Sequence, residues 1–133
     1  MNREIKYKAW DKAKKVWKIV TGLHFFGGEK LTTISYDSEE GEIMDVPVEE
    51  FEIVEYTGLK DKDGKDIYTG DVLKMDSWTP EHIQVKFIEG AFCLANAGGH
   101  YIGEIHYTNH ANIPQSTVVG NVFENPNLLK NEQ

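Results

Sequence analysis

Apolar and polar residues alternate along several short stretches of the chain. In residues 5–10, apolar side chains alternate with lysines, a period of two that is typical of a half-buried strand. A second run, residues 16–26, is rich in β-branched and aromatic residues. The polar segment Asp11–Lys15 separates the two runs, so the pattern predicts a β-hairpin.

Short strand-like runs continue through the rest of the sequence. They cover residues 30–36, 52–56, 72–75, 83–95, 101–107 and 117–123. Glu89-Gly90 is expected to form the turn of a second hairpin, and Asn125-Pro126 to end the last strand. Pro47 disfavours a central strand at its position, and a helical turn is expected near Val48–Phe51. Closely spaced strands without an amphipathic helix predict a β-barrel or β-sandwich.

The length and composition fit one cytoplasmic domain. The chain has 133 residues, of which 40% are apolar, enough for a core of its own. No apolar run approaches the roughly 18–20 residues of a membrane span, and the first ten residues lack the apolar segment of a secretory signal. Cys93 is the single cysteine, so we expect it in the core and not in an internal disulfide.

Charge is distributed unevenly. Residues 1–20 contain seven basic and two acidic residues, a net charge of +5, whereas the remainder carries −13. Aromatic residues lie among these lysines, which is typical of single-strand nucleic-acid binders. Packing in a core or a subunit interface is the favoured alternative. The candidate partner or nucleic-acid surface comprises Lys6, Lys8, Trp10, Lys12, Lys14, Lys15, Trp17 and Lys18.

The glycine- and aspartate-rich stretch 56–74, YTGLKDKDGKDIYTGDVLK, is a candidate ligand site that fails two tests. For a calcium loop starting at Asp61, the sixth position is Asp66 instead of glycine, and the twelfth is Val72 instead of glutamate. For a phosphate loop, Gly64-Lys65 lacks the following hydroxyl residue. The stretch therefore predicts two tight turns, with Gly58, Asp63, Gly64, Gly70 and Asp71 as the structural turn motif.

The remaining candidate chemistry is sparse. His100, His106 and His110 lie within eleven residues, but strand neighbours four apart are separated by about 13 Å, too far for one metal. No serine occupies a nucleophile elbow. We therefore expect no catalytic residues, no metal, no cofactor and no enzyme activity. A hydrolase or nuclease that uses His100 and His106 is the weaker alternative.

Four blocks of sequence resemble the YopX family, small proteins of phages and prophages in bacteria. The blocks are residues 3–12, 56–74, 85–94 and 118–129, and they keep their order along nearly the whole chain. The stretch 21–53 matches least. The resemblance implies a mainly β, barrel-containing fold that is often assembled as an oligomer, and it brings no catalytic residues.

Together, pattern and resemblance predict a mainly β fold with little helix. We expect a small SH3-like or partly open β-barrel with an additional N-terminal β-sheet region. Residues 1–133 would form a single YopX-like domain, in which Glu50–Thr57 is a candidate boundary between an N-terminal β region, 1–55, and a β-barrel core, 56–129.

The predicted function is that of a non-enzymatic interaction protein in the cytoplasm of a bacterial host cell. It would form a homo-oligomer and bind a host or phage protein, without a membrane partner. Single-stranded nucleic-acid binding through the basic, aromatic N-terminal hairpin is the alternative.

Overall fold

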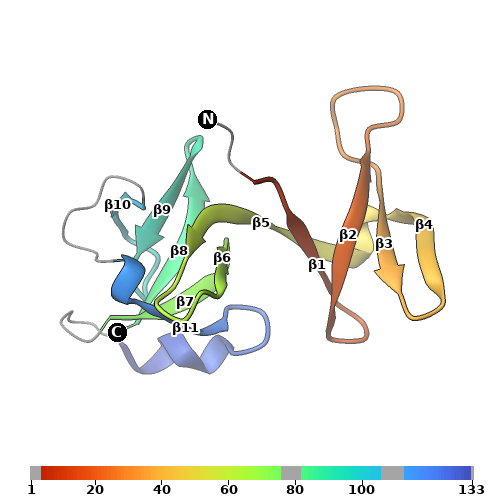
Figure 1. Ribbon diagram of the computed structural model, residues 1–133. Coiled ribbons are helices and arrows are strands. Elements are labelled where there is room, and N and C mark those ends of the chain that lie inside the picture. Colours follow the sequence, from red (N-terminus) through yellow and green to blue (C-terminus); the bar gives the residue numbers. More distant parts are fainter. Residues whose placement is uncertain (1–3, 76–81, 106–112, 133) are drawn as a thin grey trace. The chain divides into compact units, whose positions relative to one another are not determined.

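The computed structural model describes residues 4–75, 82–105 and 113–132 of the chain (Figure 1). The chain divides into two compact units between Glu55 and Tyr56. The N-terminal unit comprises Ile5–Glu55, and the C-terminal unit comprises Tyr56–Gln133 together with Met1–Glu4. Each unit has its own hydrophobic cluster and is described separately.

The N-terminal unit is an antiparallel sheet with the strand order β4-β3-β2-β1-β5. Its strands are β1 (Tyr7–Asp11), β2 (Val16–His24), β3 (Thr33–Ser38), β4 (Gly41–Pro47) and the first half of β5 (Phe51–Lys60). The predicted hairpin around Asp11–Lys15 is confirmed, with Trp10 opposite Trp17. The predicted helical turn is the 3₁₀ helix η1 (Val48–Glu50).

One face of this sheet carries the core of the unit. Ala9, Ile34 and Phe51 are buried and form a cluster. Partly buried side chains pack around it: Val20, Leu23, Leu31, Tyr36, Val46, Val48 and Ile53. In β2, Val20 and Leu23 both pack against the cluster although they are three residues apart, because the pairing with β3 shifts register between Val20 and Gly22.

Strand β4 is the terminal strand of the sheet, which explains the position of Pro47. Proline cannot donate a ladder hydrogen bond, and Pro47 lies at the last residue of this edge strand. Asp45 has a φ of 56°, which departs from strand geometry near a register shift between β3 and β4.

The C-terminal unit contains a five-stranded antiparallel sheet with the order β10-β9-β8-β7-β11. Its strands are β7 (Asp71–Lys74), β8 (His82–Ile88), β9 (Ala91–Ala95), β10 (Tyr101–Glu104) and β11 (Thr117–Asn121). The second half of β5 pairs with β6 (Asp66–Tyr68), and the 3₁₀ helices are η2 (Ile113–Gln115) and η3 (Pro126–Glu132). Leu73, Ile83, Val85 and Leu94 are fully buried in its core.

The prediction of a mainly β fold with little helix is confirmed. The strands form two antiparallel sheets, and in the described part of the chain they do not close into a barrel. The predicted Glu89-Gly90 turn joins β8 to β9. Across the described ranges, no helix has the length and apolar character needed to cross a membrane.

The last strand ends two residues before the end of the predicted run 117–123. It ends at Asn121, whose Oδ1 accepts the backbone N–H groups of Phe123 (3.0 Å) and Glu124 (2.8 Å). Asparagine side chains that accept such local bonds favour a turn over a continued strand.

Candidate protein-binding groove

The two tryptophans of the predicted surface pack against each other across β1 and β2. The ring centroids of Trp10 and Trp17 are 5.0 Å apart, and Trp10 is only 8% exposed. The Nζ atom of Lys8 lies 4.6 Å from the ring centroid of Trp17. Trp10 is therefore a packing residue. Lys8 already lies over the ring of Trp17, which the sequence suggested as a platform for base stacking.

The lysines of the hairpin turn are more accessible. Asp11 Oδ1 accepts the backbone N–H groups of Ala13 (3.1 Å) and Lys14 (3.0 Å), which fixes the turn. Lys14 and Lys15 are exposed. The Nζ atom of Lys12 lies 3.5 Å from the carboxylate of Glu52, and both side chains are half exposed. Lys6, just before β1, is half-buried.

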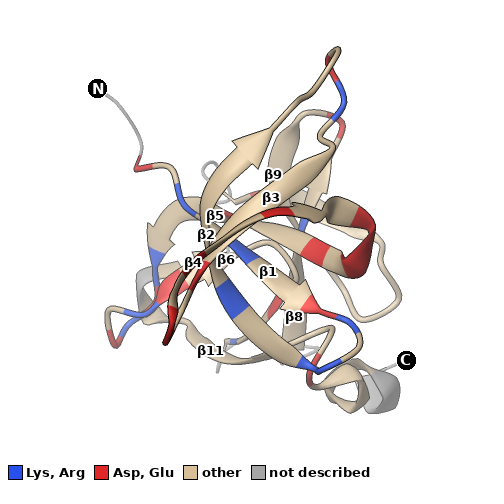
Figure 2. Cartoon of the chain, turned by 90° about the vertical axis from the view of Figure 1, so that its right-hand side faces the viewer, with Lys and Arg blue, Asp and Glu red and all other residues tan. Residues whose placement is uncertain are grey.

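A groove of about 750 Å³ lies beside this hairpin. Its lining combines lysines, apolar side chains and carboxylates: Lys14, Trp17, Lys18, Ile19, Tyr36, Asp37, Ser38, Glu39, Glu40 and Ile43. Within it, Lys18 Nζ lies 5.1 Å from the ring centroid of Tyr36. Basic and acidic residues both occur on the strands that carry the groove (Figure 2). The groove thus offers an apolar surface with charges of both signs around it.

Strand pairing explains why opposite charges meet here. Strands β2 and β3 are antiparallel, with Val20 opposite Tyr36, so the β1–β2 turn and the β3–β4 turn lie at the same end of the sheet. This pairing brings Lys14 and Lys18 to the same groove as Glu39 and Glu40. The pattern of basic and aromatic residues in the sequence did not indicate this acidic contribution. The signal that could have indicated these carboxylates is the order of two consecutive hairpins, because it places their two turns at the same end of a sheet.

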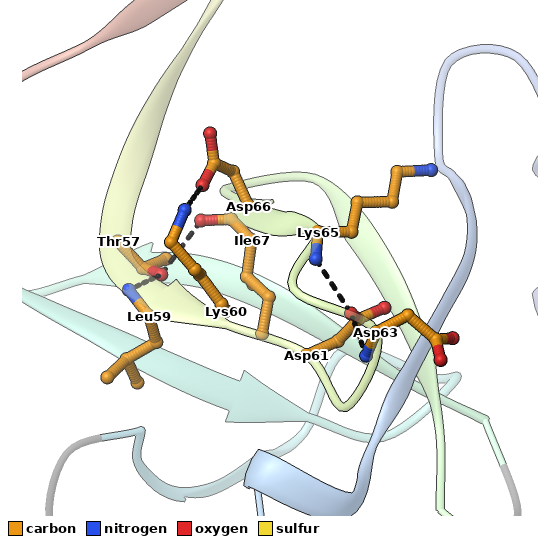
Figure 3. A network of polar contacts seen from close by, with 8 residues as sticks. All are labelled: Thr57, Leu59, Lys60, Asp61, Asp63, Lys65, Asp66 and Ile67. Carbon is orange, nitrogen blue, oxygen red and sulfur yellow. Dashed lines mark hydrogen bonds and ion pairs between the residues drawn. The ribbon is translucent and has the colours of Figure 1, made fainter.

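The stretch 56–74 lies in the C-terminal unit, where its polar side chains bind the backbone (Figure 3). Asp61 is 6% exposed, and its Oδ1 accepts the N–H groups of Asp63 and Lys65, each at 2.9 Å. Its Oδ2 accepts the N–H of Val118 at 2.9 Å. Burial alone would raise the pKa of Asp61, but these hydrogen bonds outweigh it and lower the pKa below its usual value.

Other residues of this stretch also close turns. Thr57 Oγ1 donates to the carbonyl of Ile67 (2.8 Å), and Asp71 Oδ2 accepts the N–H of Tyr68 (2.8 Å). Gly58, Gly64 and Gly70 all have positive φ values, of 91°, 82° and 88°. A Cβ atom at Gly70 would lie 2.9 Å from Cε2 of Phe123. Both the positive φ and this close contact therefore disfavour a larger residue at position 70. Asp63, in the turn before Gly64, is exposed.

Comparison with known proteins identifies a family and a similar fold. The family model for YopX protein matches residues 6–130, nearly the whole chain. The chain belongs to the YopX family. The crystal structure of protein EF1440 from Enterococcus faecalis has a similar fold, with a TM-score of 0.62 and 21% sequence identity. The match covers 97% of this YopX-family chain and 100% of the Enterococcus protein. None of the curated proteins matches the sequence.

A His–Ser–Asp cluster in the N-terminal unit of this YopX-family chain was not predicted. His24 Nε2 lies 2.9 Å from Ser35 Oγ and 3.8 Å from Asp45 Oδ1. A catalytic triad needs the carboxylate at the other ring nitrogen, and Ser35 is only 1% exposed. The backbone N–H of Asp45 also donates to Ser35 Oγ (3.3 Å). The cluster therefore links β2, β3 and β4 where their registers shift.

The histidines and the cysteine outside this cluster form no further candidate site within the described ranges. Among the described residues of this YopX-family chain, no three His, Cys, Asp or Glu side chains are arranged to hold a metal. His106 and His110 lie outside the described ranges, and His100 is exposed, with its backbone N–H donated to Asn96 Oδ1. Cys93 is buried, and burial, followed by the charge of Glu104, raises the pKa of its thiol. That shift disfavours the reactive thiolate.

Proposed function

We propose that this chain is a non-enzymatic interaction protein, encoded by a phage or prophage, that self-associates and binds a host or phage protein. The observation that supports this proposal most directly is the groove beside the β1–β2 hairpin, which is lined by apolar side chains and by charges of both signs. Protein interfaces combine an apolar centre with a polar rim in this way. The phage origin rests on the YopX-family membership.

The charges of the groove favour a protein partner over a nucleic acid. Asp37, Glu39 and Glu40 line the same groove as Lys14 and Lys18. Phosphate affinity comes from lysine and arginine, and these carboxylates repel phosphates. A protein surface, in contrast, can present groups of both signs in the matching order.

Charge reversal in the groove tests the proposed function. Tagged Lys14→Glu/Lys18→Glu protein is compared with wild type in affinity capture from bacterial host lysate, with and without nuclease. We expect the double variant to lose the captured protein by at least tenfold, because it presents carboxylates where the partner meets lysines. Nuclease should leave capture by the wild type unchanged.

A matched control separates the groove from net charge. Lys30→Glu/Lys62→Glu makes the same change of charge at two exposed lysines outside the groove. It should capture as much partner as wild type. Equal losses in both double variants, or capture that nuclease abolishes, would overturn the assignment of the groove to a protein partner.

Self-association has a separate test. The basic β1–β2 turn of one copy can face the acidic groove lining of another copy, and such charge complementarity favours a defined assembly. We expect sedimentation equilibrium to give a mass above 15.2 kDa at micromolar concentration. A monomer throughout the micromolar range would remove the oligomer from the proposal.

Single-stranded nucleic-acid binding is the second candidate, favoured by one observation. Lys14 and Lys15 are exposed at the hairpin turn, and Trp17 beside them is only partly buried. This candidate predicts salt-dependent binding of a fluorescent single-stranded oligonucleotide, which Lys12→Glu/Lys14→Glu/Lys15→Glu abolishes. The absence of binding by the wild type at low salt would reject it.

A further inference from the structure

Strand β4 presents an open edge for strand addition. It ends the sheet order β4-β3-β2-β1-β5, and none of the described residues pairs with its outer side. Residues 41–45 are all exposed. An edge strand offers a row of backbone N–H and C=O groups to a further strand, which is the basis of peptide recognition by strand addition.

The regular part of this edge is short. Asp45 has a φ of 56°, and Pro47 lacks an N–H, so neither continues a regular ladder. Gly41, at the start of the strand, has a φ of 111°, so regular strand geometry is confined to Glu42–Met44, about 10 Å of strand. An edge of this length fits a short peptide segment and disfavours extended sheet-to-sheet aggregation.

The two faces of the edge differ in chemistry. Ile43 lies opposite Tyr36 and lines the groove, so an added strand would meet apolar side chains on that face. Glu42 points to the other face, where its carboxylate accepts a hydrogen bond from Thr21 Oγ1 at 2.5 Å. Met44, two residues further along, shares that face and is exposed. Glu39 and Glu40 of the adjoining turn line the groove and add negative charge at the end of the edge.

We propose that the outer edge of β4 binds an extended peptide segment of the partner protein in which basic residues alternate with large apolar residues. Successive side chains of an added strand point to opposite faces. The apolar side chains would therefore lie beside Ile43 and Tyr36, and the basic ones beside Glu42. This proposal rests on the proposed function, because it states how the N-terminal unit would bind its protein partner.

A second copy of this chain does not fit the same edge. In an antiparallel pair of two β4 strands centred on Ile43, Glu42 of each copy would lie diagonally across from Glu42 of the other. Like charges across neighbouring strands destabilise the pairing. The acidic edge therefore favours a foreign basic segment.

A synthetic peptide tests the proposal. The probe is a fluorescent hexapeptide of alternating lysine and isoleucine, measured by fluorescence anisotropy against the full chain. We expect saturable binding that weakens at least tenfold when alternate peptide amides are N-methylated, since N-methylation removes the ladder donors. The same composition in a scrambled order should also bind at least tenfold more weakly. Equal binding of the three peptides would overturn strand addition.

Variants of the protein locate the binding edge. Glu40→Lys/Glu42→Lys should weaken binding of the alternating peptide at least tenfold. The control Glu49→Lys/Glu50→Lys makes the same change of charge at exposed residues of η1 and should bind as wild type. The bound peptide should also slow hydrogen exchange at amides within residues 41–44. Equal loss in both variants, or unchanged exchange at these amides, would contradict the β4 assignment.

The two proposals fail in different ways. If the alternating peptide does not bind but capture from lysate stays sensitive to Lys14→Glu/Lys18→Glu, strand addition is wrong and the protein-binding groove stands. If the peptide binds by these criteria but lysate capture is insensitive to the groove lysines, the edge assignment stands and the groove assignment falls.

Discussion

Asp61 accepts three backbone hydrogen bonds from two segments that are far apart in sequence. Two come from the turn at Asp63 and Lys65, and the third comes from Val118 in β11. The backbone N–H of Lys62 also donates to the carbonyl of Ser116, at 2.9 Å. The carboxylate therefore shapes its own turn and ties it to a strand more than fifty residues away. The sequence excluded Asp61 as a calcium ligand but gave no sign of this contact.

Asp61→Asn should reduce the free energy of unfolding by about 2–3 kcal/mol at neutral pH, because a buried charged acceptor is lost from three donors. Asp63→Asn, a change at an exposed carboxylate of the same turn, should stay within about 0.5 kcal/mol of wild type. Urea unfolding of the three proteins at neutral pH measures both differences.

The same substitution predicts a pH dependence. Hydrogen bonds lower the pKa of Asp61 in the folded protein, so ionisation of this group stabilises the fold fully above its unfolded pKa, about 3.9. As the pH falls through the folded pKa, that stabilisation is lost. The difference between wild type and Asp61→Asn should therefore shrink under acidic conditions. A difference that stays constant down to pH 2 would contradict the assigned role of the carboxylate.

At the scale of elements, the two-residue turns of the hairpins differ in backbone conformation. Glu89 and Gly90 join β8 to β9 with φ values of 48° and 86°, so both residues are left-handed. Such a turn matches the twist of the flanking strands, and asparagine or glycine is favoured at its first position. Glutamate carries a steric cost there. In the β3–β4 turn, Glu40 does not have a positive φ.

Glu89→Asn should therefore raise the free energy of unfolding by about 0.5–1 kcal/mol, because asparagine tolerates the left-handed region better than glutamate. Glu40→Asn makes the same chemical change in a turn without that strain and should give no increase. Thermal unfolding followed by circular dichroism compares the two variants with wild type. Equal shifts in both would show that the loss of negative charge, and not relief of the backbone, is responsible.

Local pattern predicted these hairpins because each depends on neighbouring residues. The alternation in 5–10 and the turn Glu89-Gly90 lie within a few positions of the elements that they define. The pairing of β1 with β5 joins Trp10 to Glu52 across more than forty residues, and no local signal indicates it. The early end of β11 was missed for a different reason, since the capping bonds of Asn121 override a strand-like sequence.

At the scale of the whole molecule, the charge asymmetry of the sequence does not divide between the two units. Each unit contains seven basic and eleven acidic residues in the sequence that it spans. The basic run of residues 1–20 falls largely in the same unit as the acidic β3–β4 turn, and the two meet at the groove. The sequence could therefore indicate the lysines of the candidate site but not the carboxylates beside them, which depend on strand register.

The separate cores predict that the two units respond to different core substitutions. Ile34 is fully buried in the N-terminal cluster, and Leu73 is fully buried in the C-terminal cluster. Ile34→Ala and Leu73→Ala each remove three side-chain carbon atoms from a core and should cost about 2–5 kcal/mol. Native-state hydrogen exchange should show Ile34→Ala lowering protection mainly in β1–β3 and Leu73→Ala mainly in β7–β9, because local opening follows the loss of local packing.

The milder change Ile34→Val, at about 1 kcal/mol, keeps the test informative if Ile34→Ala fails to fold. Equal loss of protection in both sets of strands from either substitution would show that the chain opens as one cooperative unit, in spite of its two cores.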